Sequence, residues 1–129
     1  MIRIMLCCAS GMSTSLLVEK MKKAALEQGI EAEIWAVGAN EVKANANRTD
    51  IILLGPQVRY AQRKIESEAP GVPVAHIDMK DYGMMNGQSV LKQALAILEK
   101  INNEVETKAL LFLLSKFLLF IFFNLMHTV

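Results

Sequence analysis

The chain is 129 residues long, which is enough for one domain with a hydrophobic core and too short for two. Hydrophobic residues make up 53% and charged residues 21%, with a formal net charge of +1. This balance is typical of a soluble globular domain, and because the basic residues are scattered among acidic ones, it argues against a nucleic-acid partner.

The first half of the chain alternates strand-like and helix-like stretches. A short apolar run predicts a strand over Ile2–Cys7, and near-helical spacing of apolar residues predicts a helix over Thr14–Gln28. Alternating residues predict a second strand over Glu31–Val37. A weak, short helix is expected over Asn40–Ala46, with Asn40 as its cap.

The second half continues the same order. Asp50–Leu54 is a continuous apolar run, which is typical of a strand covered on both faces. A helix over Gln57–Ala69, a strand over Val72–Ile77 and a helix over Gly87–Asn103 follow. This regular order predicts an α/β fold with a four-stranded parallel sheet flanked by helices.

In such folds the ligand binds at the carboxyl ends of the strands. The loops that begin at Cys8, Gly55 and Asp78 are therefore the places where chemistry is expected. Side chains of the last two loops would border the site, although each fits a turn or packing role equally well. They are Gln57, Tyr60, Asp78, Tyr82 and Gly83.

The first of these loops has the features of a phosphate cradle. Small residues allow tight backbone turns, and Gly11 is able to take a positive φ, so that successive N–H groups form an anion-binding nest. The amino end of the following helix adds a partial positive charge, which also favours the thiolate of Cys8. Three hydroxyls are available to cap the helix or contact phosphate oxygens. The predicted phosphate-binding residues are Ala9, Ser10, Gly11, Met12, Ser13, Thr14 and Ser15, with Cys8 as the nucleophile.

The two cysteines, Cys7 and Cys8, are adjacent, and a disulfide between neighbours is strained. Cys7 alternates onto the opposite face of the strand, so we expect it in the core. The sequence has neither a Cys-x-x-Cys motif nor a His/Cys cluster, and we expect no metal and no cofactor. The apolar run at the amino terminus is too short for a signal peptide, which favours a reducing, cytoplasmic compartment.

The stretch IMLCCASGMSTSLLVEKM resembles the active-site loop of the IIB subunits of the lactose, cellobiose and chitobiose family of sugar phosphotransferase systems. The resemblance continues through DIILLGPQVRY, VPVAHIDMKDYGMMNG and VLKQALAIL, and covers about residues 1–103. Cys8 is the cysteine that matches the family's C-x-x-G-M-S-T-S pattern.

The resemblance implies a sugar phosphotransferase with a fold like that of low-molecular-weight phosphatases and a phosphocysteine relay. A phosphohistidine on a IIA partner donates its phosphoryl group to Cys8. Cys8 passes it to a sugar held by the membrane-embedded IIC transporter, at the inner face of the membrane. The implied sugar is a β-linked disaccharide such as cellobiose, chitobiose or lactose.

Two other functions stay open. A phosphatase of that fold has the pattern C-x5-R, in which the arginine clamps the phosphate. Here the residue six after Cys8 is Thr14, and six after Cys7 is Ser13. The second alternative is a degenerate IIB-like module that binds without transferring phosphate, against which the intact Cys8 and Gly11 count.

The composition changes sharply near residue 105, which predicts a domain over 1–105 and a separate tail over 106–129. All five phenylalanines lie beyond Thr107, and the last acidic residue is Glu106. We expect the tail to be helical. It is a membrane anchor, the remnant of a fused IIC segment, or an extension without function. The short apolar run and its central Lys116 favour the latter two.

Overall fold

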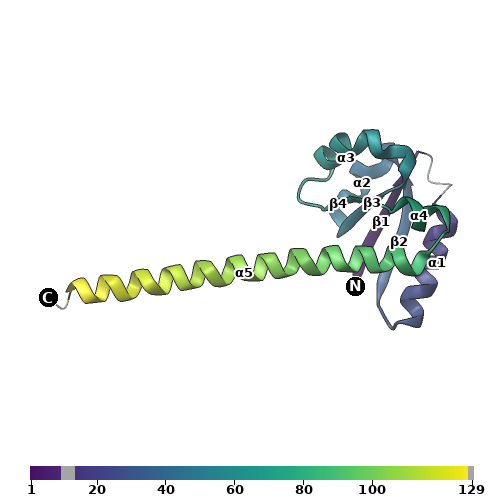
Figure 1. The fold of residues 1–129 in the computed structure, drawn as a ribbon. Coiled ribbons are helices and arrows are strands. Elements are labelled where there is room, and N and C mark those ends of the chain that lie inside the picture. The colour runs from purple at the N-terminus through teal and green to yellow at the C-terminus, as the bar shows by residue number, and fades with distance from the viewer. Residues whose placement is uncertain (10–13, 128–129) are drawn as a thin grey trace. The chain divides into compact units, whose positions relative to one another are not determined.

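A computed structural model describes residues 1–9 and 14–127 of the chain (Figure 1). The chain divides into two compact units, Met1–Ala96 and Ile97–Val129. The change in composition after Glu106 lies inside the second unit. The division into a domain over 1–105 and a tail over 106–129 stays a prediction.

The first unit is built on a four-stranded sheet, as the sequence predicts (Figure 1). Its strands are β1 (Ile2–Cys8), β2 (Ala32–Gly38), β3 (Ile51–Leu54) and β4 (Val74–His76). They lie in the order β2-β1-β3-β4, and every neighbouring pair is parallel. All four carboxyl ends therefore meet at one edge, which is where a ligand is expected.

The inner strands are apolar over the stretches where both of their faces are covered, which are all of β3 and β1 after Arg3. The residues from Ile4 to Cys8 in β1, and every residue of β3, are fully buried. On one face, Cys7 joins a cluster with Leu54 of β3, Val42 and Ile65. The prediction that Cys7 is a core residue is confirmed.

The helices follow the predicted order, except that one begins as a 3-10 helix and one short helix is additional. Helix α1 (Ser15–Glu27) follows β1. The helix after β3 begins as the 3-10 helix η3 (Pro56–Ala61) and continues as α3 (Gln62–Glu68). A short helix, α4 (Met79–Gly83), occupies what the sequence suggested was only a loop.

The weak helix expected over Asn40–Ala46 is broken into three pieces, η1 (Ala39–Glu41), α2 (Val42–Asn45) and η2 (Ala46–Arg48). Asn40 lies inside η1, so its prediction as the cap was wrong. Gly38 has the cap position instead, and its N–H donates to Oε2 of Glu41 at 3.1 Å.

The last helix, α5 (Gly87–His127), is longer than predicted and continues from the first unit into the second (Figure 1). The sequence predicted one helix to Asn103 and a helical tail, and the structure joins them without a break. In the first unit its amino end buries Gly87, Val90, Leu91 and Ala94. A Cβ at Gly87 would lie 2.5 Å from the carbonyl carbon of Lys20, so α1 and α5 cross closely there.

We expect Gly87→Ala to destabilise the first unit and Gly83→Ala to leave it unchanged. A methyl group at Gly87 meets backbone atoms of Lys20 and Met21 at 2.5–2.6 Å, whereas one at Gly83 meets nothing within 4 Å. Overpacking of this kind costs about 1–3 kcal/mol. Urea unfolding of both variants measures the difference, and equal stabilities would contradict the close crossing.

Candidate functional site

Cys8 ends β1 at the carboxyl edge of the sheet. It pairs in register with Gly38 of β2, and its neighbour Cys7 pairs with Leu54 of β3. The side chain of Cys8 is fully buried. The predicted nucleophile therefore lies at the end of β1, between the ends of β2 and β3.

The hydroxyl of Thr14 donates a hydrogen bond to Sγ of Cys8, with 3.5 Å between the two atoms. Thr14 is fully buried and has the N-cap position of α1, yet its side chain makes no capping bond. Its backbone is helical, with φ −97° and ψ −5°, whereas a capping side chain usually needs an extended backbone. The sequence predicted that this hydroxyl caps the helix or contacts phosphate oxygens. In the structure it contacts the sulfur of Cys8 instead.

This contact places the amino end of α1 beside the sulfur of Cys8. The amide groups at the start of a helix have a partial positive charge that stabilises anions. A thiolate or a phosphoryl group on Cys8 would be stabilised at this position.

Most of the predicted phosphate cradle cannot be placed, because Ser10, Gly11, Met12 and Ser13 lie outside the described residues. The two ends of the segment are described. Ala9 is an exposed residue directly after β1, and Ser15 is the exposed first residue of α1. The cradle stays a prediction.

The loop after β3 lies directly against the cysteines. The N–H of Gly55 donates to the carbonyl oxygen of Cys7 at 2.8 Å. A Cβ at Gly55 would lie 3.7 Å from Cβ of Cys8 and 2.9 Å from Oε1 of Gln57. The sequence predicted a turn at Gly55-Pro56 but no role for Gly55 at the site; the signal that was available is a Gly-Pro pair directly after a buried strand.

Two of the five predicted bordering residues are brought together. The amide of Gln57, in η3, donates to the phenol oxygen of Tyr82 in α4 at 3.2 Å. This bond joins the loops that follow β3 and β4. Gln57 also lies next to Gly55, and the role of Gln57 and Tyr82 at the border of the site stays a prediction.

Among the described residues, the structure shows no contact between the site and the other three that the sequence predicted to border it. Asp78 caps α4 by accepting a bond from the N–H of Asp81 at 3.0 Å. Tyr60 is 85% exposed, and Gly83 ends α4 beside open space. Their roles at the site remain predictions.

The two adjacent cysteines differ in their surroundings. Burial, together with the smaller effects of the negative charges of Cys8 and Glu68, raises the pKa of Cys7 from 9.0 to about 11. Cys7 is therefore a neutral thiol near neutral pH, and a neutral thiol is a weak nucleophile.

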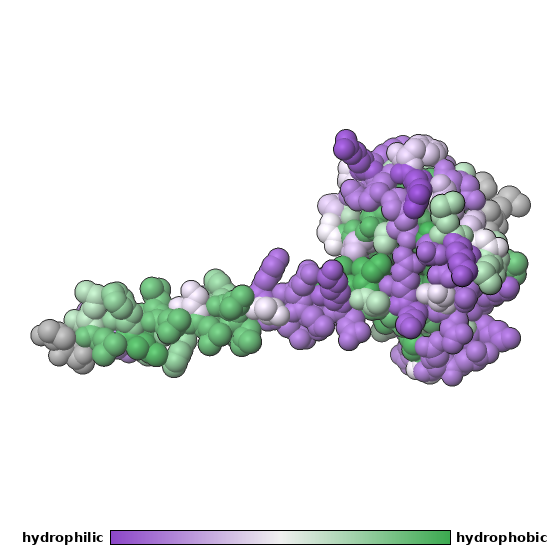
Figure 2. Space-filling view, viewed as in Figure 1, coloured by the Kyte–Doolittle hydropathy of each residue, from purple (hydrophilic) through white to green (hydrophobic). Residues whose placement is uncertain are grey.

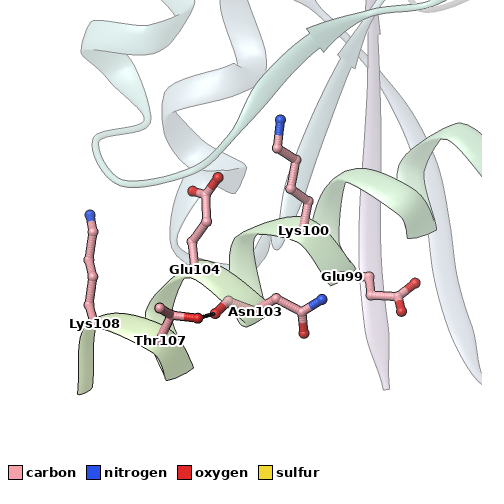
Figure 3. A pocket seen from close by; sticks show the side chains of 6 residues that line it. All are labelled: Glu99, Lys100, Asn103, Glu104, Thr107 and Lys108. Carbon is pink, nitrogen blue, oxygen red and sulfur yellow. Dashed lines mark hydrogen bonds between the residues drawn. The ribbon is translucent and has the colours of Figure 1, made fainter. Parts of the chain in front are cut away.

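No group of three or more His, Cys, Asp or Glu side chains gathers to hold a metal ion within residues 1–9 and 14–127. A surface hollow lies wholly in the second unit and is lined by side chains of α5 alone (Figure 3). They are Glu99, Lys100, Asn103, Glu104, Thr107 and Lys108. Because these residues belong to one helix and include none of the predicted site residues, the hollow adds nothing to the site at Cys8.

The family model of the lactose/cellobiose-specific IIB subunit of the PTS system matches residues 3–93. The oligo-beta-mannoside-specific EIIB component of Bacillus subtilis (strain 168) is 45% identical over 98 residues, covering 74% of this chain and 95% of that protein. The cellobiose-specific EIIB component of Lactococcus lactis subsp. lactis (strain IL1403) is 44% identical over 98 residues, covering 70% of this chain and 91% of that protein.

Solved structures agree with these matches. The cellobiose-specific phosphotransferase IIB component protein from Borrelia burgdorferi superposes with a TM-score of 0.66 at 36% identity, covering 77% of this chain and 93% of that one. The lactose-specific IIB domain from Streptococcus pneumoniae gives 0.67 at 17% identity, covering 74% of this chain and 95% of that one. The second likeness concerns the fold alone.

The stability of the first unit should fall as the pH rises from about 9 to 11, partly through Cys7. Because the pKa of Cys7 is higher in the folded chain, the unfolded chain loses this proton first, and unfolding becomes easier across that window. The contribution is about 2–3 kcal/mol. Urea unfolding at several pH values should show a weaker pH dependence in Cys7→Ala than in the native chain. Parallel pH dependences would show that Cys7 titrates normally.

Proposed function

The chain belongs to the lactose/cellobiose-specific IIB subunits of the phosphotransferase system, and we propose that Cys8 is the residue that carries its phosphoryl group. Members of this family are phosphotransferases of sugar uptake. The observation that supports Cys8 is the hydrogen bond from Thr14 at the amino end of α1, because it places a polar donor and a helix end at this sulfur. Cys7 is packed in the apolar core and stays protonated.

The proposed reaction has two transfers. First, Cys8 loses its proton, its sulfur attacks the phosphorus of a phosphohistidine on a IIA partner, and the N–P bond breaks. Second, a hydroxyl oxygen of the sugar held by IIC attacks the same phosphorus, the S–P bond breaks, the hydroxyl proton passes to water, and the thiolate returns. Phosphoryl transfer depends mainly on in-line positioning and on charge stabilisation, which backbone and hydroxyl donors supply without a metal.

The second transfer returns the sulfur to the thiolate, which Thr14 helps to stabilise. When the S–P bond breaks, negative charge appears on the sulfur, and a hydroxyl already directed at it donates a stronger, charge-assisted bond. The amino end of α1 acts on the same charge. Because Cys8 is buried in this structure, each partner must also gain access to its sulfur.

We propose a β-linked disaccharide, such as cellobiose, chitobiose or lactose, as the sugar. The supporting observation is that two similar proteins are named for oligo-beta-mannosides and cellobiose. The partners would be a IIA phosphohistidine protein and a IIC transporter, met at the cytoplasmic face of the membrane.

The native chain should gain one phosphate when it is incubated with phosphoenolpyruvate, the general phosphotransferase proteins and a cognate IIA. Cys7→Ser should gain it too, and Cys8→Ser should gain none. Intact-protein mass spectrometry measures the added mass, and lability to iodine tests for a phosphorus–sulfur bond. Phosphate on Cys8→Ser would refute the proposal, and no phosphate on the native chain would favour a binding module.

Thr14→Val should slow the transfer from IIA to Cys8 by roughly 10- to 100-fold, which is the rate equivalent of one lost hydrogen bond to a charged group. Thr14→Ser keeps the hydroxyl and should restore most of the rate. Quenched-flow transfer from phosphorylated IIA gives the rates, and urea unfolding checks that both variants are folded. If valine and serine transfer equally fast, the hydroxyl has no role in the chemistry.

A further inference from the structure

The second unit carries an apolar segment, residues 109–126 of α5, which the proposed function does not use. Thirteen of its eighteen residues are Leu, Ile or Phe. Figure 2 shows this end of α5 as mostly hydrophobic on the face in view. Those from Leu110 to Leu125 are between 39% and 70% exposed. Apolar surface of this extent marks a contact with another molecule or with lipid.

Two common explanations of such a helix do not apply here. A core helix of a soluble protein is mostly buried, whereas the most apolar window of α5 is 0% buried. A signal sequence lies near the amino terminus, whereas this segment lies in the last 21 residues of the chain. Its apolar residues also surround the helix, so it lacks the polar face of a helix that lies flat on a membrane.

We propose that the apolar segment spans a lipid bilayer and anchors the chain to the membrane. Eighteen helical residues extend about 27 Å, close to the roughly 30 Å of a bilayer's hydrocarbon core. By length and composition, α5 is long and apolar enough to cross a membrane. In a bilayer, every backbone group of a continuous helix is satisfied within the helix itself.

Lys116 is the residue that counts most against a membrane span, because it places a charge near the middle of the apolar segment. The position of its side chain reduces this cost. Its Nζ lies 4.5 Å from the ring centroid of Phe112, one turn nearer the amino end of the helix. Helical side chains lean in that direction, and a lysine uses its long stem to bring its charge towards the interface. The ammonium therefore lies about one turn closer to the aqueous boundary before Ala109 than its own Cα.

The lysines also set an orientation. Lys92, Lys100 and Lys108 precede the apolar segment. Basic residues that flank a span are retained on the cytoplasmic side. The segment would then cross outward, leaving the first unit in the cytoplasm.

His127, directly after the carboxyl end of the apolar segment, is an amphipathic residue at the position where the second membrane interface is expected. The ring of His127 lies 4.3 Å from that of Phe123, and its Nδ1 is 3.2 Å from the carbonyl oxygen of Phe123. An imidazole at the last turn suits the interface and the negative end of the helix. An anchor would hold the first unit near any membrane-embedded partner and raise its effective concentration there.

The first experiment is alkaline carbonate extraction of membranes from bacteria that produce the full chain. The native chain should stay in the membrane pellet. Leu114→Asp with Leu118→Asp should move it to the supernatant, because each aspartate near the middle of a span lowers insertion on the order of a hundredfold. The matched control, Leu26→Asp with Met79→Asp, changes two exposed apolar residues of the first unit and should stay in the pellet.

Native chain in the supernatant would overturn the proposal. If that soluble chain sedimented as an oligomer that the Leu114 and Leu118 substitutions dissociate, a second copy would be the partner of the segment and the bilayer would be excluded. Neither result depends on phosphotransfer, so this proposal and the role of Cys8 fail separately.

The second experiment tests spanning and orientation in intact spheroplasts with a membrane-impermeant maleimide. His127→Cys should be labelled from outside, and Asn103→Cys only after lysis, with the native chain reporting any labelling of the buried Cys7 and Cys8. Labelling of His127→Cys only after lysis would overturn the span.

Discussion

The position of β1 between β2 and β3 is the constraint on which the site depends. Hydrogen bonds on both sides fix its register, and successive side chains of a strand point to opposite faces. Cys7 is thereby directed into the apolar cluster with Leu54, and Cys8 to the face where α1 begins at Thr14. A shift of one residue would exchange the two cysteines, because the period of a strand is two.

That geometry gives two neighbouring thiols different chemistry. Burial keeps the pKa of Cys7 high, so it stays neutral, whereas Cys8 has a hydroxyl donor and a helix end beside its sulfur. Residues 8–15 include no lysine or arginine. A phosphoryl group there would be held by neutral donors and less activated towards water than in a site with an arginine clamp. This suits a carrier, whose phosphoryl group must last until a partner arrives.

Helix α5 presents two kinds of surface along one continuous backbone. Its first turns pack in the first unit through Gly87, Val90 and Leu91, and its last turns present apolar side chains around the whole helix. On scales of membrane insertion, each Leu, Ile or Phe contributes about 0.3–0.6 kcal/mol and one central lysine costs about 2.5–3.5 kcal/mol. Thirteen such residues outweigh Lys116, more so because its charge reaches back over Phe112.

The sequence by itself determined the parallel α/β architecture and the apolar tail, and it led to the proposal of Cys8, because the order of the elements along the chain, motif spacing and composition are local properties. Only the tertiary structure decided that Thr14 contacts the sulfur and that Gly55 lies against both cysteines. Those contacts join residues whose approach depends on strand register and loop path. The cap wrongly predicted at Asn40 has a local cause instead, because the carboxylate of Glu41 accepts from the N–H of Gly38 and the helix begins at Ala39.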